Sequence, residues 1–92
     1  MMMMDGIPKK IADRYVETEI DDEVILLRLS DGDMFSLLGT SREIWKCIDG
    51  ERSAAAIAAE LAERHAAASE PVANDVARFV DDLRDAGLVE LA

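Results

Sequence analysis

Residues 33–45 read DMFSLLGTSREIW, and within them the pattern changes from that of a strand to that of a helix. From Met34 to Leu38 the chain is uncharged and largely apolar, which is typical of a short strand. Thr40 and Glu43 then have the spacing of a capping box, in which each side chain bonds a free amide of the first helical turn. The stretch therefore predicts a strand that ends near Leu38 and a helix that begins at Thr40.

Two more strands are predicted ahead of this one. Residues 15–20 alternate between an apolar face and a solvent face that carries Glu17 and Glu19. Glu23–Leu29 is apolar on both faces, as expected for a middle strand that is covered on either side. Asp-rich and Gly-containing turns separate the three runs, so an antiparallel meander is predicted, with the first and third strands as its edges.

Three helices should follow the meander. The first is predicted from Thr40 to about Asp49 with Gly50 after it, the second from Ser53 to about Ala66, and the third from Pro71 to Ala86-Gly87. Their apolar stripes predict a core that contains Ile44, Trp45, Ile48, Ile57, Leu61, Val72, Val76, Phe79, Val80 and Leu83. Cys47 is expected on a buried helix face, His65 packed or half-buried, and the tail Leu88–Leu91 on the sheet.

Length and composition limit the function. The 92 residues suit one domain, predicted over residues 14–92 after a flexible arm at 1–13. The net charge of −10 opposes binding to nucleic acid and to anionic membranes. A single cysteine, with neither a signal peptide nor an apolar run of membrane-spanning length, favours a cytoplasmic protein.

Chemistry-bearing motifs are absent from the sequence. One cysteine and one histidine without clustered ligand spacing predict neither catalytic residues, nor a metal site, nor a cofactor. The five glycines are scattered and form no phosphate-binding loop. A carrier of a phosphopantetheine arm would need Asp-Ser-Leu at a helix start, and no serine here has that context. We therefore predict a protein that is not an enzyme.

A set of positions spread over residues 23–89 resembles the PqqD-like proteins, also called RiPP recognition elements. The set comprises Leu37, Thr40, Ile44, Trp45, Asp49-Gly50, Arg52-Ser53, Ile57, Leu61-Ala62, Asp75-Val76, Phe79, Leu83 and Gly87-Leu88. The sequence departs from the family pattern at Leu38, where Asn is common, and at Ala56, where an acidic residue is frequent. The resemblance implies a small α+β, winged-helix-like domain with a three-stranded meander followed by three helices.

The resemblance also implies a function. Members of this family bind the leader segment of a ribosomally made precursor peptide and present it to a separate modifying enzyme, such as a radical SAM enzyme, a cyclase or a leader protease. The third predicted strand carries no charge and no proline, so a peptide could join it as a further strand beside the last helix. The predicted contacts are Met34, Phe35, Ser36, Leu37, Leu38, Asp75, Val76, Arg78, Phe79 and Asp82. The acidic residues of that helix would attract a basic leader.

Two other functions stay open on the residues alone. The strand edge could be covered by the tail, by the last helix or by a second copy, which would make the chain a structural or dimerisation module. A winged-helix regulator could instead read DNA with its third helix, although Asp75, Asp81, Asp82 and Asp85 oppose phosphate contacts. We expect a monomer or a weak homodimer.

Overall fold

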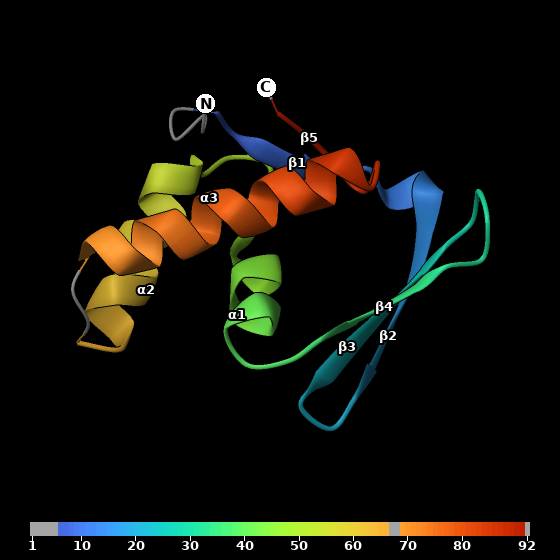
Figure 1. The fold of residues 1–92 in the computed structure, drawn as a ribbon, viewed down its shortest axis with the longest axis horizontal. Coiled ribbons are helices and arrows are strands. Elements are labelled where there is room, and N and C mark those ends of the chain that lie inside the picture. The colour runs from blue at the N-terminus through green and yellow to red at the C-terminus, as the bar shows by residue number, and fades with distance from the viewer. Residues whose placement is uncertain (1–5, 67–68, 92) are drawn as a thin grey trace.

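The computed structural model describes residues 6–66 and 69–91, and it confirms an α+β fold with a three-stranded meander followed by three helices (Figure 1). A short additional strand stands at each end of the described chain. The elements are β1 (Pro8–Lys10), the 3-10 helix η1 (Ala12–Arg14), β2 (Tyr15–Ile20), β3 (Glu23–Arg28), β4 (Met34–Leu37), α1 (Thr40–Cys47), α2 (Ala54–Arg64), α3 (Ser69–Asp85) and β5 (Val89–Leu91).

Strands β2, β3 and β4 form an antiparallel sheet in that order, so β3 is the middle strand, as predicted. A two-residue turn joins β2 to β3, and Asp21 takes a positive φ of 54° there. The loop between β3 and β4 is longer and includes Gly32, whose φ of 78° suits glycine. Arg28 holds this loop through ion pairs to Asp31 and Asp33, and its hydrogen bond lowers the pKa of Asp31 to about 2.

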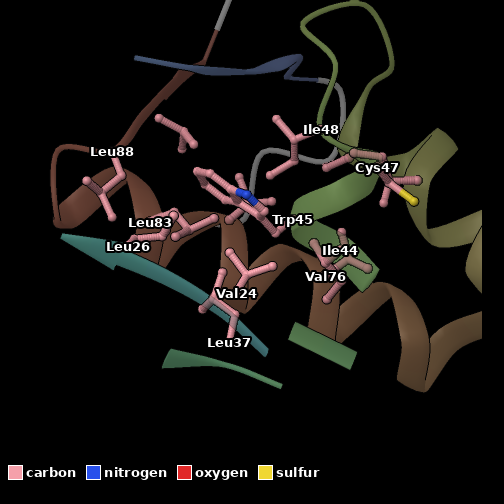
Figure 2. Close-up of a cluster of buried hydrophobic side chains, with 14 of the residues drawn as sticks. Val24, Leu26, Leu37, Ile44, Trp45, Cys47, Ile48, Val76, Leu83 and Leu88 are labelled. Carbon is pink, nitrogen blue, oxygen red and sulfur yellow. The ribbon is translucent and has the colours of Figure 1, made fainter. Parts of the chain in front are cut away.

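The core lies between one face of this sheet and the helices (Figure 2). Trp45 is completely buried there, as predicted, and the ring of Tyr15 meets it edge-on at 5.4 Å between centroids. The ammonium of Lys10 lies 4.2 Å from the centre of the Trp45 ring, an attractive cation–π arrangement. Burial lowers the pKa of Lys10. Trp45 therefore joins β1, β2 and α1 in one packed cluster.

Both ends of the described chain differ from the sequence-based prediction. Residues 1–5 of the predicted arm at 1–13 lie outside the described residues, and within the rest Pro8–Lys10 forms β1 and Ala12–Arg14 forms η1. The tail was predicted to lie on the sheet, which is wrong, because β5 pairs with β1 in a separate two-stranded sheet. Pro8 is opposite Leu91 and Lys10 is opposite Val89. A strand this short gives no readable alternation, and its pairing partner is about eighty residues away in sequence.

One face of the three-stranded sheet points away from the helices, and this face is exposed and apolar. The sequence had predicted instead that β3 would be covered on both faces and that β2 would expose only one face to solvent. We call this surface the outer face. It includes Val16, Ile20, Leu27, Leu29, Met34 and Leu38, which are the exposed large apolar residues of the described chain. In β2 only Tyr15 is buried, because Val16, Thr18 and Ile20 lie on the uncovered outer face and β2 is an edge strand.

The boundaries of the helices also needed correction. Helix α1 ends at Cys47, two residues before the predicted end at Asp49, and Ile48 already has an extended backbone. The carboxylate of Asp49 instead accepts the amide protons of Glu51 and Arg52, which lowers its pKa to about 2. The predicted start of α2 is confirmed, since the Ser53 side chain accepts a bond from an amide of the first turn.

Two single residues had been assigned an environment from their position on a helix. Cys47 is buried, as predicted, and burial raises the pKa of its thiol. His65 is exposed rather than packed, and its Nε2 lies 2.8 Å from a carboxylate oxygen of Glu43. His65 follows Arg64, the last residue of α2, and its backbone is no longer helical, so the spacing from Ile57 does not determine the direction of its side chain.

Candidate functional site

Strand β4 is an edge of the three-stranded sheet, so half of its backbone groups point away from the other strands. The amide of Arg28 donates to the carbonyl oxygen of Asp33 at 2.8 Å, which makes these two residues a hydrogen-bonded pair. Such pairs alternate along an antiparallel ladder, so Phe35 and Leu37 point their backbone groups at β3. The N–H and C=O groups of Met34 and Ser36 therefore point to the open edge.

Side chains along β4 alternate between the two faces of the sheet. Phe35 and Leu37 point to the core side, where Leu37 is buried and Phe35 is partly buried. Met34 and Ser36 belong to the outer face, and the Ser36 hydroxyl bonds the carboxylate of Glu23 on β3. Leu38 follows the strand and is 58% exposed. The five predicted strand residues thus offer two open backbone positions, with Phe35 the partly exposed apolar contact on the core side.

A hollow of about 240 Å³ opens between the first turn of α1 and one side of α3. Its lining consists of Thr40, Ser41, Ile44, Asp75, Arg78, Phe79 and Asp82. Four of the predicted helix residues therefore meet in one cavity. Val76 does not line it, because its side chain is completely buried in the core.

Sequence reasoning missed the contribution of α1 to this hollow. Thr40 and Glu43 were predicted to form a capping box, which is wrong: Gly39 is the N-cap residue, with φ 56°, and no side chain caps the helix. Thr40 is already the first helical residue and lines the hollow. Glu43 bonds His65 instead. The predicted start of α1 was the signal that could have located these residues, because the first turn of a helix that follows a strand directly is exposed beside that strand.

The charges at the hollow come from α3. Asp75 and Asp82 lie two turns apart on the same face of α3, with Arg78 between them. All three side chains are exposed. No ion pair engages any of the three within residues 6–66 and 69–91. Two carboxylates against one guanidinium leave a net negative rim around the apolar ring of Phe79. This arrangement can bind an apolar group and attract a cationic one.

The opposite edge of the sheet, β2, has a different character. Glu19 was predicted to lie on a solvent face, but its carboxylate points to α1 and bonds Arg42 and Lys46, each at 2.5 Å. Hydrogen bonds from Lys46 and Arg42 lower the pKa of Glu19. Glu17 remains exposed beside the edge. One glutamate therefore keeps a charge next to this edge, while β4 has none.

A second hollow, of about 370 Å³, lies where η1 and the end of β3 approach the end of α3. The Arg28 guanidinium in its wall is already engaged, because it donates to the carbonyl oxygen of Ala86 at 2.9 Å and pairs with Asp31 and Asp33. Of the two guanidinium groups that line this hollow, that of Arg28 is thus committed to internal contacts, while Arg14 has no ion pair within residues 6–66 and 69–91.

The described part of the chain contains no group of three or more histidine, cysteine or acidic side chains arranged to hold a metal ion. Across the same residues, none of the helices combines the length and the apolar character that a membrane crossing requires.

Comparison with known proteins gives two matches. The family model described as coenzyme PQQ synthesis protein D, or PqqD, matches residues 23–89. A solved structure described as TbiB1 in complex with the TbiA(beta) leader peptide is 30% identical, with a TM-score of 0.77. The match covers 88% of this chain and 94% of that one. No curated protein sequence matches the chain.

Proposed function

Because the chain belongs to the PqqD family and is a RiPP recognition element, we propose that it binds the leader segment of a ribosomally synthesised precursor peptide. The observation that carries this proposal is the open, uncharged edge of β4. The solved relative with 30% identity is complexed with a leader peptide, which supports the same ligand class here.

In this proposal the leader adds a fourth strand to the sheet. The backbone groups of Met34 and Ser36 bond the peptide, and the hollow beside Phe79 receives a side chain from it. Phe35 supplies apolar contact on the core side, while the buried side chains of Leu37 and Val76 support the site from within the core. Thr40 and Ser41 join the ten predicted residues as further contacts.

The protein is proposed to act without catalysis of its own. The bound leader leaves the rest of the precursor free, so a separate enzyme would modify that part while the leader stays on the sheet. DNA binding is less consistent with this surface, because Asp75 and Asp82 flank Arg78 on the exposed side of α3 and would repel phosphates.

The test is an amide-shift titration with a synthetic precursor leader peptide. We expect the signals of residues 34–38 and of the residues around Asp75, Arg78 and Phe79 to move together, because one peptide would contact both segments. Signals near Glu17, on the opposite edge, should stay in place. Shifts confined to β2 or to Lys9 and Lys10 would contradict strand addition at β4.

The acidic rim leads to a prediction about salt. If a basic leader approaches Asp75 and Asp82, the association rate constant should fall as salt screens the attraction, while the dissociation rate constant changes less. A double Asp75→Asn and Asp82→Asn variant should associate about threefold more slowly at low salt. Stopped-flow binding at several salt concentrations measures both constants.

A matched control is available on the same helix. Asp85 is exposed but does not line the hollow, so Asp85→Asn removes one charge without touching the site. Its association rate should stay near that of the parent protein. Equal slowing by Asp85→Asn would mean that net charge alone, and not the rim of the hollow, attracts the peptide.

A further inference from the structure

Two apolar side chains at the edge strand β4 lie where an added strand would cover them. Met34 is 66% exposed and Leu38 is 58% exposed, and these are the highest values among the large apolar residues of the outer face. Met34 and Ser36 project to that face, and Leu38 continues the alternation directly after the strand. The hollow between α1 and α3 lies on the core side, so it does not account for this exposure.

A strand that adds to the edge of β4 continues the alternation of the sheet. Side chains directly opposite each other on neighbouring strands project to the same face, with Cβ atoms about 4.5–5.5 Å apart. Three leader residues, each separated from the next by one residue, would therefore lie opposite Met34, Ser36 and Leu38 on the outer face. The residues between them would face the core side, where Phe35 and the hollow lie.

The first and last of these three leader residues would meet apolar side chains. Met34 is opposite Leu27 on β3, and Leu27 is opposite Val16 on β2, so a leader residue opposite Met34 would extend an apolar row to a fourth strand. At the other end, the leader residue would cover the exposed side chain of Leu38. Apolar cross-strand pairs stabilise a sheet, whereas a charged residue at either position would have no partner for its charge.

The middle leader residue, opposite Ser36, would meet a negative charge. Among the outer-facing residues of β2, β3 and β4, Glu23 alone is charged. Its carboxylate accepts a hydrogen bond from the Ser36 hydroxyl, which holds the charge beside the middle of the β4 edge. Glu23 has no ion pair with any residue of 6–66 and 69–91. A lysine or arginine opposite Ser36 is long enough to reach this carboxylate, and an acidic residue would be repelled.

We propose that the β4 edge selects leaders in which a basic residue lies between two apolar residues, each two positions away. The basic residue pairs with Glu23, and the two apolar residues pack against Met34 and Leu38. This inference rests on the proposed function, because it requires the leader to join β4 as a strand. The pattern reads the same in both directions, so it holds for a leader that joins β4 in either orientation.

Peptide selection tests the proposal with random short peptides displayed on phage. The library is first depleted on the Ser36→Pro variant and then selected on the whole parent chain, so the retained peptides are those that need the open edge. We expect enrichment of the pattern apolar, any, basic, any, apolar. Selection on Glu23→Lys should instead enrich an acidic residue in the middle position, because the charge on the sheet is reversed.

Isothermal titration with one retained peptide measures the size of each contribution. Replacing its basic residue by glutamine should weaken binding about threefold, and Glu23→Gln should do the same. Both changes together should still weaken binding only about threefold, because they remove the same pair. Replacing both apolar residues of the peptide by serine should weaken binding about tenfold.

Matched variants separate lost contacts from a lost fold. Met34→Ala and Leu38→Ala shorten exposed side chains, so each should keep the fold and weaken binding about threefold. Glu17→Gln removes the same charge as Glu23→Gln, but at the opposite edge of the sheet, and should leave the affinity unchanged. Circular dichroism of each variant confirms folding.

Three results would overturn the proposal. Retained peptides that shift the amide signals of residues 34–38 without a preference at the three positions would refute this selectivity and leave leader binding at β4 standing. Independent weakening by Glu23→Gln and by the glutamine peptide, about ninefold in combination, would show that the basic residue pairs with a different charge. Retained peptides that leave the signals of residues 34–38 in place would contradict the proposed function together with this inference.

Discussion

Replacing Ser36 by proline is expected to weaken leader binding at least about tenfold while the domain stays folded. Proline has no N–H, and the N–H of Ser36 points to the open edge rather than to β3. The loss of one bond to the peptide, together with the bulk of the ring at the edge, accounts for a factor of this size. Isothermal titration with the leader measures the affinity, and circular dichroism monitors the fold.

The sheet provides a matched control on its other edge. Glu17 occupies the equivalent outward-facing backbone position on β2, because the residues that pair with β3 through hydrogen bonds alternate along that strand too. Glu17→Pro should leave binding unchanged and be tolerated in the same way. Ser36→Ala keeps the amide and loses only the bond to Glu23, so it should bind almost normally. Normal binding by Ser36→Pro would exclude strand addition at this edge.

Replacing Trp45 by alanine is expected to lower the free energy of unfolding by about 3–5 kcal/mol, the usual cost of removing a large buried aromatic side chain. Small domains have about 5–15 kcal/mol in total, so this loss removes a large share of the stability. The substitution also removes the ring that Tyr15 and Lys10 contact, which links β1 and β2 to the helices. Urea denaturation followed by circular dichroism measures the change.

A surface substitution of similar chemistry calibrates this result. Leu38→Ala truncates a large apolar side chain that is 58% exposed, and we expect it to change the free energy of unfolding by less than about 0.5 kcal/mol. Trp45→Phe should fall between the two, because it keeps an aromatic ring in the same space. If Trp45→Ala proved as mild as Leu38→Ala, the indole would not be the centre of the core.

The sequence was most informative where a pattern is local. The meander, the middle position of β3 and the apolar stripe of α3 all follow from periodicity over a few residues, and the structure confirms them. The start of α1 was located correctly, although its cap was not: Gly39, with its positive φ, supplies the N-cap without any side chain. A backbone conformation of this kind leaves no charged or hydroxyl signature for sequence reasoning to use.

Features that depend on distant pairing could not be read in the same way. Strands β1 (Pro8–Lys10) and β5 (Val89–Leu91) pair although they lie near opposite ends of the described chain. Each has only three residues, which is too short to show an alternation of apolar and polar positions. The exposure of Val16 and Ile20 depends on which face of the sheet the helices cover, which no single strand encodes. The hollow beside β4 needed both α1 and α3, and only the α3 half was predicted.

The pairing of β1 with β5 also determines how the domain would respond to a mechanical pull. Pro8 and Leu91 are the outermost pair, so a force applied through the two ends would load that pair first, then Lys9 with Glu90, then Lys10 with Val89. The three pairs would therefore open one after another. Strands that are pulled past each other along their length would instead load all of their pairs at the same time. Traction on both ends would therefore peel away β1 and β5 at low force, before it reached the strands that present the β4 edge.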